Sequence, residues 1–209
     1  MSVRAVIFDL GEVLVNGMRG AEERLAPFLR LPPSEVKKQL NANGHLGRHF
    51  RGEITEERYW RALITDFSWP ARVQDLKRLM RENFQEVPGM RAILENLARR
   101  YKLGLLSDIG QEWAEYSEAK FGYAHLFSAI QYSYQVGFGK PCPEAYTRLL
   151  SELGVLSYRC MFIDDKERNV TAARQLGMLA LQFTSTRVLW EVLRRMGLLE
   201  IKLLPAIVR

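Results

Sequence analysis

The sequence VRAVIFDLGEVL, at residues 3–14, decides how the rest of the chain is interpreted. Its apolar run, Val3 to Phe8, has the length and composition of a strand buried on both faces. Such strands are typical of parallel sheets that helices cover on both sides. The run ends directly at Asp9. The stretch therefore indicates an α/β fold with a carboxylate placed where a buried strand ends.

Four more apolar runs of similar length follow along the chain. They are Leu103 to Leu106, Ala129 to Tyr132, Cys160 to Ile163 and Met178 to Phe183. Most segments between them have helical spacing, such as the run from Tyr146 to Leu153 that Gly154 closes. Because strands and helices alternate, the pattern predicts a three-layer α/β fold with a parallel sheet.

Residues 18–86 break this alternation. They contain several amphipathic helical patterns and no convincing strand, with a new helix expected at Pro32 and Pro33. Pro88 and Gly89 mark the return to the α/β pattern. We therefore expect an α/β core formed by residues 1–17 and 87–209, with a helical insert at residues 18–86. An apolar C-terminal stretch, Leu198 to Val208, could form one more strand.

The composition favours a globular cytoplasmic protein. With 47% hydrophobic residues in a chain of 209, a sizeable core can form. The apolar runs fall far short of the roughly 20 residues that span a bilayer, and no leader-like segment precedes Val3. We therefore expect no membrane association. Cys142 and Cys160 are too few for a disulfide framework or a thiolate zinc site, so we expect both to be reduced thiols.

The formal net charge of +6 favours anionic partners. The basic residues are spread along predicted helices, and no motif that reads nucleic acid accompanies them. We therefore interpret them as a solvated surface and expect no nucleic-acid partner.

Polar residues follow three of the predicted strands. Asp9 follows the first, Ser107 and Asp108 the second, and Asp164 and Asp165 the fourth. Ligands of open parallel sheets bind beyond the carboxyl ends of the strands, so these side chains should converge. Lys140 joins them from the loop 137–141, just before a helix that Pro143 can start.

This set of residues suits phosphoryl transfer. Asp9 can attack phosphorus and form an aspartyl-phosphate. Asp164 would share a Mg²⁺ with it, and Asp165 would hold a coordinating water. Ser107 offers a hydroxyl to the phosphoryl oxygens and Lys140 offers a positive charge, so both join Asp9 as predicted catalytic residues. Substrate contacts are predicted for Ser107 and Lys140, together with Asp108, Gly11 and Glu12.

Each residue alone has a structural explanation. Asp9, Ser107 and the Asp164–Asp165 pair could cap helices, and Lys140 could be a surface charge. The combination favours a site, because three like charges that converge on one sheet edge need a cation to coexist.

Four segments resemble the ordered motifs of the haloacid dehalogenase (HAD) superfamily. They are VIFDLGEVL (6–14), LLSD (105–108), GKPCPEAY (139–146) and FIDD (162–165). The resemblance implies a Rossmann-like core, a mobile helical cap of the first type at residues 18–86, and usually Mg²⁺-dependent phosphatase activity. The subgroup it resembles contains sugar-phosphate phosphatases and the phosphatase-like N-terminal domains of epoxide hydrolases.

One position departs from the pattern of that superfamily. Its phosphatases usually carry a second aspartate two residues after the nucleophile, as general acid and base, and here that residue is Gly11. The Gly11 carbonyl can still bind Mg²⁺, but proton transfer, typically worth about 10² to 10⁴ in rate, lacks its usual donor. Glu12, Asp108 or a cap residue could substitute. The cap candidates form a basic cluster that could equally be an exposed loop: His45, Arg48, His49 and Arg51.

Three functions follow as hypotheses. The first is a Mg²⁺-dependent hydrolase of small phosphorylated metabolites. The second is a dehalogenase in which Asp9 attacks a halogen-bearing carbon without a metal, although the Asp164–Asp165 pair argues against it. The third is a non-catalytic regulatory module that binds phosphate and Mg²⁺, suggested by Gly11.

Overall fold

The computed structural model describes residues 2–199, whose centre is a five-stranded parallel sheet in the order β5-β4-β1-β6-β7. Its strands are, in chain order, β1 (Ala5–Phe8), β4 (Lys102–Ser107), β5 (Ala129–Tyr132), β6 (Cys160–Asp164) and β7 (Leu179–Gln182). In the central strand, Ala5 pairs with Lys102 on one side and with Cys160 on the other. All four residues of β1 are fully buried, as a strand covered on both faces requires.

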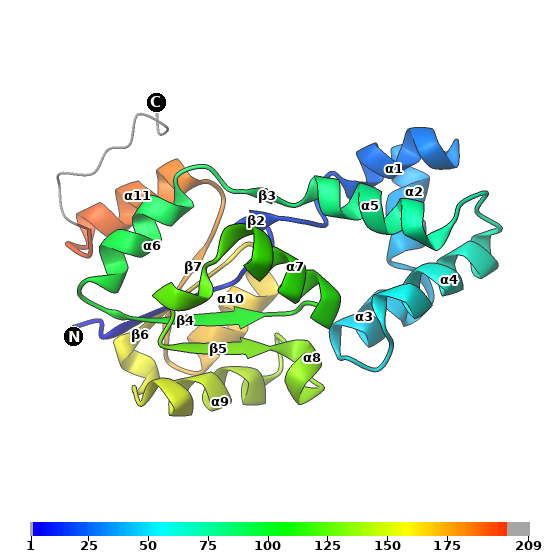
Figure 1. The fold of residues 1–209 in the computed structure, drawn as a ribbon. Coiled ribbons are helices and arrows are strands. Elements are labelled where there is room, and N and C mark those ends of the chain that lie inside the picture. The colour runs from blue at the N-terminus through cyan, green and yellow to red at the C-terminus, as the bar shows by residue number, and fades with distance from the viewer. Residues whose placement is uncertain (1, 200–209) are drawn as a thin grey trace.

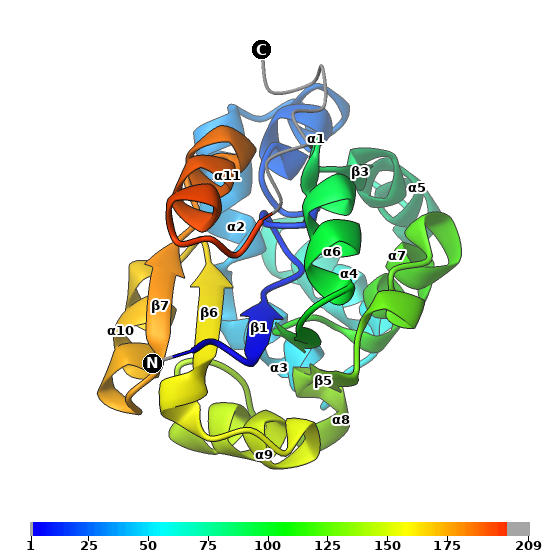
Figure 2. The same ribbon diagram turned by 90° about the vertical axis from the view of Figure 1, so that its left-hand side faces the viewer.

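Helices cover both faces of the sheet (Figures 1 and 2). One layer consists of α6 (Met90–Ala98), α7 (Gln111–Phe121) and α11 (Thr186–Arg195). The other face carries α9 (Pro143–Leu153) and α10 (Glu167–Gln175), and the short α8 (Ser133–Val136) follows β5. Because side chains alternate along a strand, Val6 and Phe8 pack into the first layer while Ala5 and Ile7 pack into the second. The predicted three-layer α/β fold is confirmed.

Five helices stand beyond one end of the sheet, on the right of Figure 1. They are α1 (Ala21–Leu29), α2 (Pro33–Leu40), α3 (His45–Phe50), α4 (Glu56–Phe67) and α5 (Val73–Asn83). We call residues 18–86 the helical insert. Its α2 begins at Pro33, as predicted, because proline suits the first helical turn.

Two short strands join the insert to the core. β2 (Val15–Asn16) and β3 (Gln85–Glu86) pair antiparallel, so the chain leaves and returns side by side. The expectation of no strand within residues 18–86 is therefore wrong at its last two positions. The division into a core and a cap at residues 17/18 and 86/87 stays a proposal.

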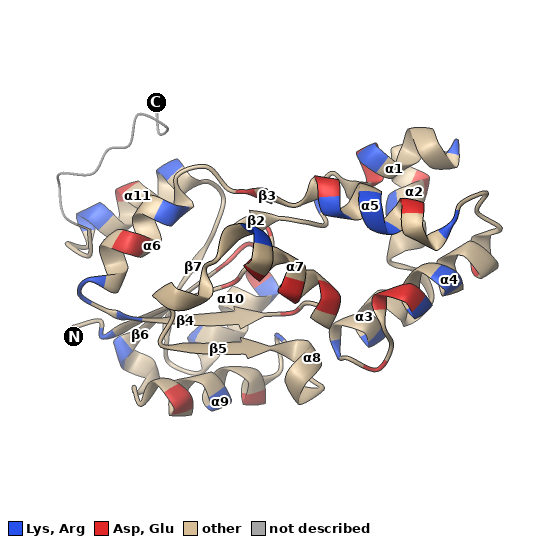
Figure 3. Ribbon diagram, in the orientation of Figure 1, with Lys and Arg blue, Asp and Glu red and all other residues tan. Residues whose placement is uncertain are grey.

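The five predicted core strands all form, with ends that differ by up to two residues. Cys142 and Cys160 are free thiols, as predicted. The apolar stretch expected as a further strand, Leu198 to Val208, lies outside the described residues from position 200 onward. Within residues 2–199, no helix combines the length and apolar character needed to cross a membrane. Basic and acidic residues are interspersed over the helices of both parts (Figure 3).

Candidate active site

Three neighbouring strands deliver the predicted site residues to one edge of the sheet. Asp9 follows β1 directly, Ser107 is the last residue of β4, and Asp164 is the last residue of β6. Since β4, β1 and β6 are adjacent and parallel, these three side chains meet at the carboxyl end of the sheet. All three are buried, and Asp164 is fully so.

Lys140 lies between two of the carboxylates. Its ammonium is 2.8 Å from Asp9 Oδ1 and 2.8 Å from Asp164 Oδ2, and it also donates to the Leu106 carbonyl at 2.8 Å. An ammonium has three N–H donors, so all of them are used. Lys140 thus neutralises and positions the carboxylates from behind, and it is not among the residues that line the pocket described below.

One ammonium cannot balance the charges of this cluster. Burial raises the pKa of Asp9 to about 7, with Lys140 opposing that shift and Asp164 adding to it. Burial acts in the same direction on Asp164, but Lys140 and hydrogen bonds from Lys166 and Asn169 outweigh it and hold the pKa of Asp164 below its usual value. The pKa of Lys140 is raised, because Asp9 and Asp164 outweigh its burial. Arg19, whose side chain is 65% exposed, pairs with Asp165 at 3.3 Å. Asp9 and Asp164 then share one ammonium, so the ionised cluster keeps surplus negative charge.

A divalent cation fits this cluster. Asp9, Asp164 and Asp165 each offer a carboxylate oxygen, and these oxygens lie within 4.8 Å of one another. Asp165 Oδ1 is buried without a hydrogen-bond partner among the described residues. Hard carboxylate oxygens are the ligands that Mg²⁺ takes in proteins. The orphaned oxygen and the surplus charge are what a bound cation would satisfy.

Two predicted substrate-contact residues have structural partners of their own. Asp108 Oδ1 accepts a hydrogen bond from the Lys140 backbone N–H at 3.0 Å, and a Cβ at Gly139 would lie only 2.3 Å from it. The Asp108 carboxylate thereby holds the loop 137–141, which carries Lys140.

Glu12, in the left-handed region at φ 63°, accepts hydrogen bonds through Oε1 from the N–H groups of residues 17, 18 and 19. Glu12 thus shapes the start of the insert.

Gly11 faces open space. A Cβ at this position would meet nothing within 4 Å, and its φ is not in the left-handed region. The site therefore has room for a side chain at the position where the resemblance expects an aspartate.

The basic cluster of the insert lies away from the site. His45 and the guanidinium groups of Arg48 and Arg51 pair with carboxylates within the insert, namely Asp66 and Glu53. His49 is fully buried, and its ring lies edge-on to Trp113 with centroids 4.9 Å apart. None of these four insert residues, which were candidate proton donors, is among the described residues that line the pocket.

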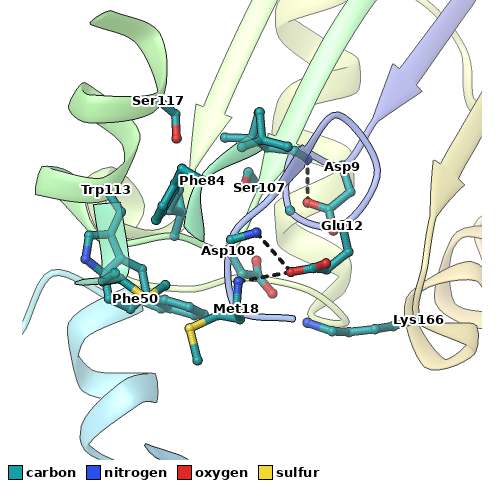
Figure 4. Close-up of a pocket in the computed structure, with 16 residues that line it drawn as sticks. Asp9, Glu12, Met18, Phe50, Phe84, Ser107, Asp108, Trp113, Ser117 and Lys166 are labelled. Carbon is teal, nitrogen blue, oxygen red and sulfur yellow. Dashed lines mark hydrogen bonds between the residues drawn. The ribbon is translucent and has the colours of Figure 1, made fainter. Parts of the chain in front are cut away.

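A pocket opens from the carboxylates toward the insert. Figure 4 shows Asp9, Glu12 and Lys166 on one side of it and Phe50, Phe84 and Trp113 on the other. The pocket also includes Gly11, Ser107 and Asp108.

Lys166 and the aromatic residues of this pocket were not among the residues predicted from the sequence. The only available signal for Lys166 was its place directly after Asp165. The aromatic residues carried none, because side chains of pocket walls and of cores share one apolar pattern.

The comparisons with known proteins agree with this geometry. The family model described as haloacid dehalogenase-like hydrolase matches residues 3–177. The phosphatase MT3486 of Mycobacterium tuberculosis is 30% identical over 188 residues, which are 86% of this chain and 87% of that protein. In structure, the HAD family enzyme bt-2542 of Bacteroides thetaiotaomicron, in complex with magnesium and inorganic phosphate, is similar with a TM-score of 0.75 at 20% identity, over 88% of this chain and 96% of that chain.

Two further relatives are longer proteins. The drimenol cyclase drtB of Aspergillus calidoustus is 30% identical over 87% of this chain, which spans 34% of the cyclase. A flavin mononucleotide hydrolase of Arabidopsis thaliana is 30% identical over 71% of this chain and 60% of its own length. The family model covers most of the chain, including Asp9. The chain belongs to the haloacid dehalogenase-like hydrolase family.

Proposed function

We propose that the protein is a Mg²⁺-dependent phosphomonoesterase that acts on small phosphorylated metabolites through an aspartyl-phosphate on Asp9. The observation that carries the proposal is the cluster of Asp9, Asp164 and Asp165, whose carboxylate oxygens lie within 4.8 Å of one another, with one buried ammonium, that of Lys140, shared by Asp9 and Asp164. The phosphatases among the relatives and the magnesium and phosphate bound to bt-2542 support the same chemistry.

The proposed reaction uses the chain's own residues in two stages. Asp9 attacks the phosphorus atom, a new P–O bond forms, and the bond to the alcohol breaks, so that the alcohol oxygen leaves with the electron pair. Water then hydrolyses the aspartyl-phosphate, releasing phosphate and the free Asp9 carboxylate. Ser107 would donate its hydroxyl to a phosphoryl oxygen, and Lys166 would add positive charge from the pocket wall. A bound Mg²⁺, held by Asp9, Asp164 and the Gly11 carbonyl with Asp165 nearby, would supply further charge to the phosphoryl oxygens.

Lys140 has a positioning role in this proposal. Its ammonium bridges Asp9 Oδ1 and Asp164 Oδ2, so the other oxygen of Asp9 would be the one that attacks phosphorus. We therefore revise the predicted direct contact between Lys140 and the substrate to an indirect one.

The decisive experiment measures phosphate release by the purified chain from a panel of phosphomonoesters, with Mg²⁺ and with EDTA. We expect release that requires Mg²⁺ and that falls by at least about 10³ in Asp9→Asn, because the amide is not a nucleophile. Circular dichroism and a melting curve check that the variant folds.

Two outcomes would contradict the proposal. Release of halide from 2-haloacids in EDTA would favour the dehalogenase reaction. Binding of Mg²⁺ and inorganic phosphate without turnover of any ester would favour a regulatory module.

A further inference from the structure

The wall of the pocket opposite the carboxylates is apolar. Six side chains form it, four from the helical insert and two from the α7 region of the core: Met18, Phe50, Met80, Phe84, Ile109 and Trp113. Figure 4 shows the three aromatic rings gathered on this side. The insert residues that line the pocket are all apolar.

The polar edge of the largest ring in this wall faces away from the pocket. Trp113 Nε1 donates to Glu56 Oε1 at 2.7 Å, and the same carboxylate accepts from Trp60 and forms an ion pair with Arg81. The indole N–H is therefore hydrogen-bonded within the insert–core interface, and the Trp113 ring contributes only carbon atoms to the wall.

One polar side chain that lines the pocket beside this wall has no hydrogen-bond partner among the described residues. Ser117 is 3% exposed and lines the pocket, and its Oγ makes no hydrogen bond with any described residue. Figure 4 shows this hydroxyl on the side of Phe84, away from Asp9. A buried hydroxyl without a partner is costly, so a ligand that satisfies it gains affinity.

These features select the organic part of a phosphate ester. A polyhydroxylated chain would lose its hydrogen bonds to water and find one hydroxyl in return, which is unfavourable. An alkyl or aryl group would instead remove apolar surface of both the ligand and the pocket wall from water, which is favourable.

We propose that the physiological substrate is the phosphate monoester of a predominantly apolar alcohol, which carries at most one hydrogen-bonding group, received by Ser117. The inference rests on the proposed function and names its substrate class. The phosphate would lie against Asp9 and Ser107, and the organic group would extend between the insert and α7.

The size of the pocket limits the organic group. Its volume is about 70 Å³, whereas an engineered protein cavity that binds benzene measures about 150 Å³. The end of the pocket at Asp9 and Ser107, where the phosphate would lie, shares this volume, so only a short aliphatic group fits the pocket as it stands. Met18 and Met80 are unbranched and change rotamer easily, so a modestly larger group can be admitted.

The test compares two esters with four carbons each, butyl phosphate and erythritol 4-phosphate. We expect kcat/KM to favour butyl phosphate by roughly tenfold or more, because a hydrophobic pocket disfavours an isostere with an added hydroxyl by up to about 10². The polyol is the better leaving group, so leaving-group chemistry cannot produce this preference. A preference for erythritol 4-phosphate would overturn the inference while leaving phosphatase activity established.

Binding of compounds that cannot be hydrolysed separates this inference from the proposed function. In the presence of Mg²⁺, butylphosphonate should bind at least tenfold more tightly than methylphosphonate, which has almost no chain to bury. Equal affinities would overturn the apolar subsite whether or not the protein turns over any ester. Tight, chain-dependent binding without turnover would instead contradict the phosphatase proposal alone.

Two pairs of variants assign the effect to the wall. Met80→Gln, which adds an amide at similar volume, should reduce the preference for butyl phosphate, whereas Met80→Leu should retain it. Ser117→Ala should lower the ratio of kcat/KM for the best of a series of ω-hydroxyalkyl phosphates to kcat/KM for the matching alkyl phosphate about fivefold. Equal effects of Ser117→Ala on both series would exclude Ser117 as the receptor of a substrate group.

Discussion

Gly11 is the residue at which the sequence departs most from the family pattern. Its position, two residues after Asp9, usually carries the proton donor, and the neighbouring Glu12 is engaged through Oε1 with three backbone N–H groups. Asp108 accepts from the loop 137–141. We therefore expect the wild-type protein to hydrolyse aryl phosphates better than alkyl phosphates, since phenolate leaves without protonation.

Gly11→Asp should restore the donor. The space at Gly11 is open and its backbone conformation suits any residue, so the side chain can enter without displacing a neighbour. We expect kcat/KM for alkyl phosphates to rise by roughly 10² or more, with a smaller gain for aryl phosphates. The measurement is the dependence of kcat/KM on leaving-group pKa, which should flatten in the variant.

Gly11→Ala is the matched control, because it adds a Cβ without an acid. If it raises activity as much as Gly11→Asp, the gain comes from loop rigidity and not from proton transfer. A steep leaving-group dependence that persists in Gly11→Asp would also contradict the donor role.

At the scale of elements, the contact between α3 and the start of α7 fixes how the insert meets the core. His49 packs against Gly110, where a Cβ would lie 2.0 Å from its Nε2 atom. Burial lowers the pKa of His49, which keeps the ring neutral, and its Nδ1 lies 3.3 Å from the Ile54 carbonyl. Ser133 on α8 adds a hydrogen bond to the Phe50 carbonyl. These contacts place Phe50 over the pocket.

Gly110→Ala should disturb this contact specifically. Gly110 has an extended backbone, with φ −78° and ψ 155°, so alanine fits the local conformation and only the clash with His49 remains. Overpacking of this kind costs about 1–3 kcal/mol. In a chain of this size the melting temperature should fall by roughly 2–12 °C.

A double-mutant cycle checks the assignment. His49→Ala alone creates a cavity and destabilises, but in the Gly110→Ala background it also removes the clash, so the two effects should be less than additive. Additive losses would mean that residues 49 and 110 do not interact as described.

For the whole molecule, the sequence predicts what strand topology dictates. Asp9, Ser107 and Asp164 were predictable as neighbours because the carboxyl ends of parallel strands share one edge of the sheet. β2 and β3 were not, because two-residue strands carry no periodicity. The place of Lys140 behind the carboxylates and the partners of His49 depend on how loops and the insert pack, which spacing along one chain does not encode.

The site couples metal binding, protonation and stability of the whole protein. Burial raises the pKa of Asp9 to about 7, well above its ordinary value of 3.8, and burial also raises the pKa of Asp165. Ionising these carboxylates in the metal-free protein therefore costs folding free energy as the pH rises from about 4 to about 7. A bound cation should remove that cost.

Mg²⁺ affinity should consequently depend on pH. At pH 5.5 Asp9 is mostly protonated, so Mg²⁺ must displace a proton from its carboxylate. At pH 7.5 the Asp9 carboxylate is mostly ionised. The apparent Kd for Mg²⁺ should be roughly twentyfold weaker at pH 5.5, and the rise in melting temperature at a fixed Mg²⁺ concentration correspondingly smaller. Calorimetric titration at both pH values measures this directly.

The control is Asp9→Asn. This variant has no proton to lose at this position, so it should bind Mg²⁺ more weakly and with a flatter pH dependence. Equal affinities at the two pH values in the wild type would show that Asp9 is already ionised at pH 5.5, with Lys140 as a sufficient counter-ion.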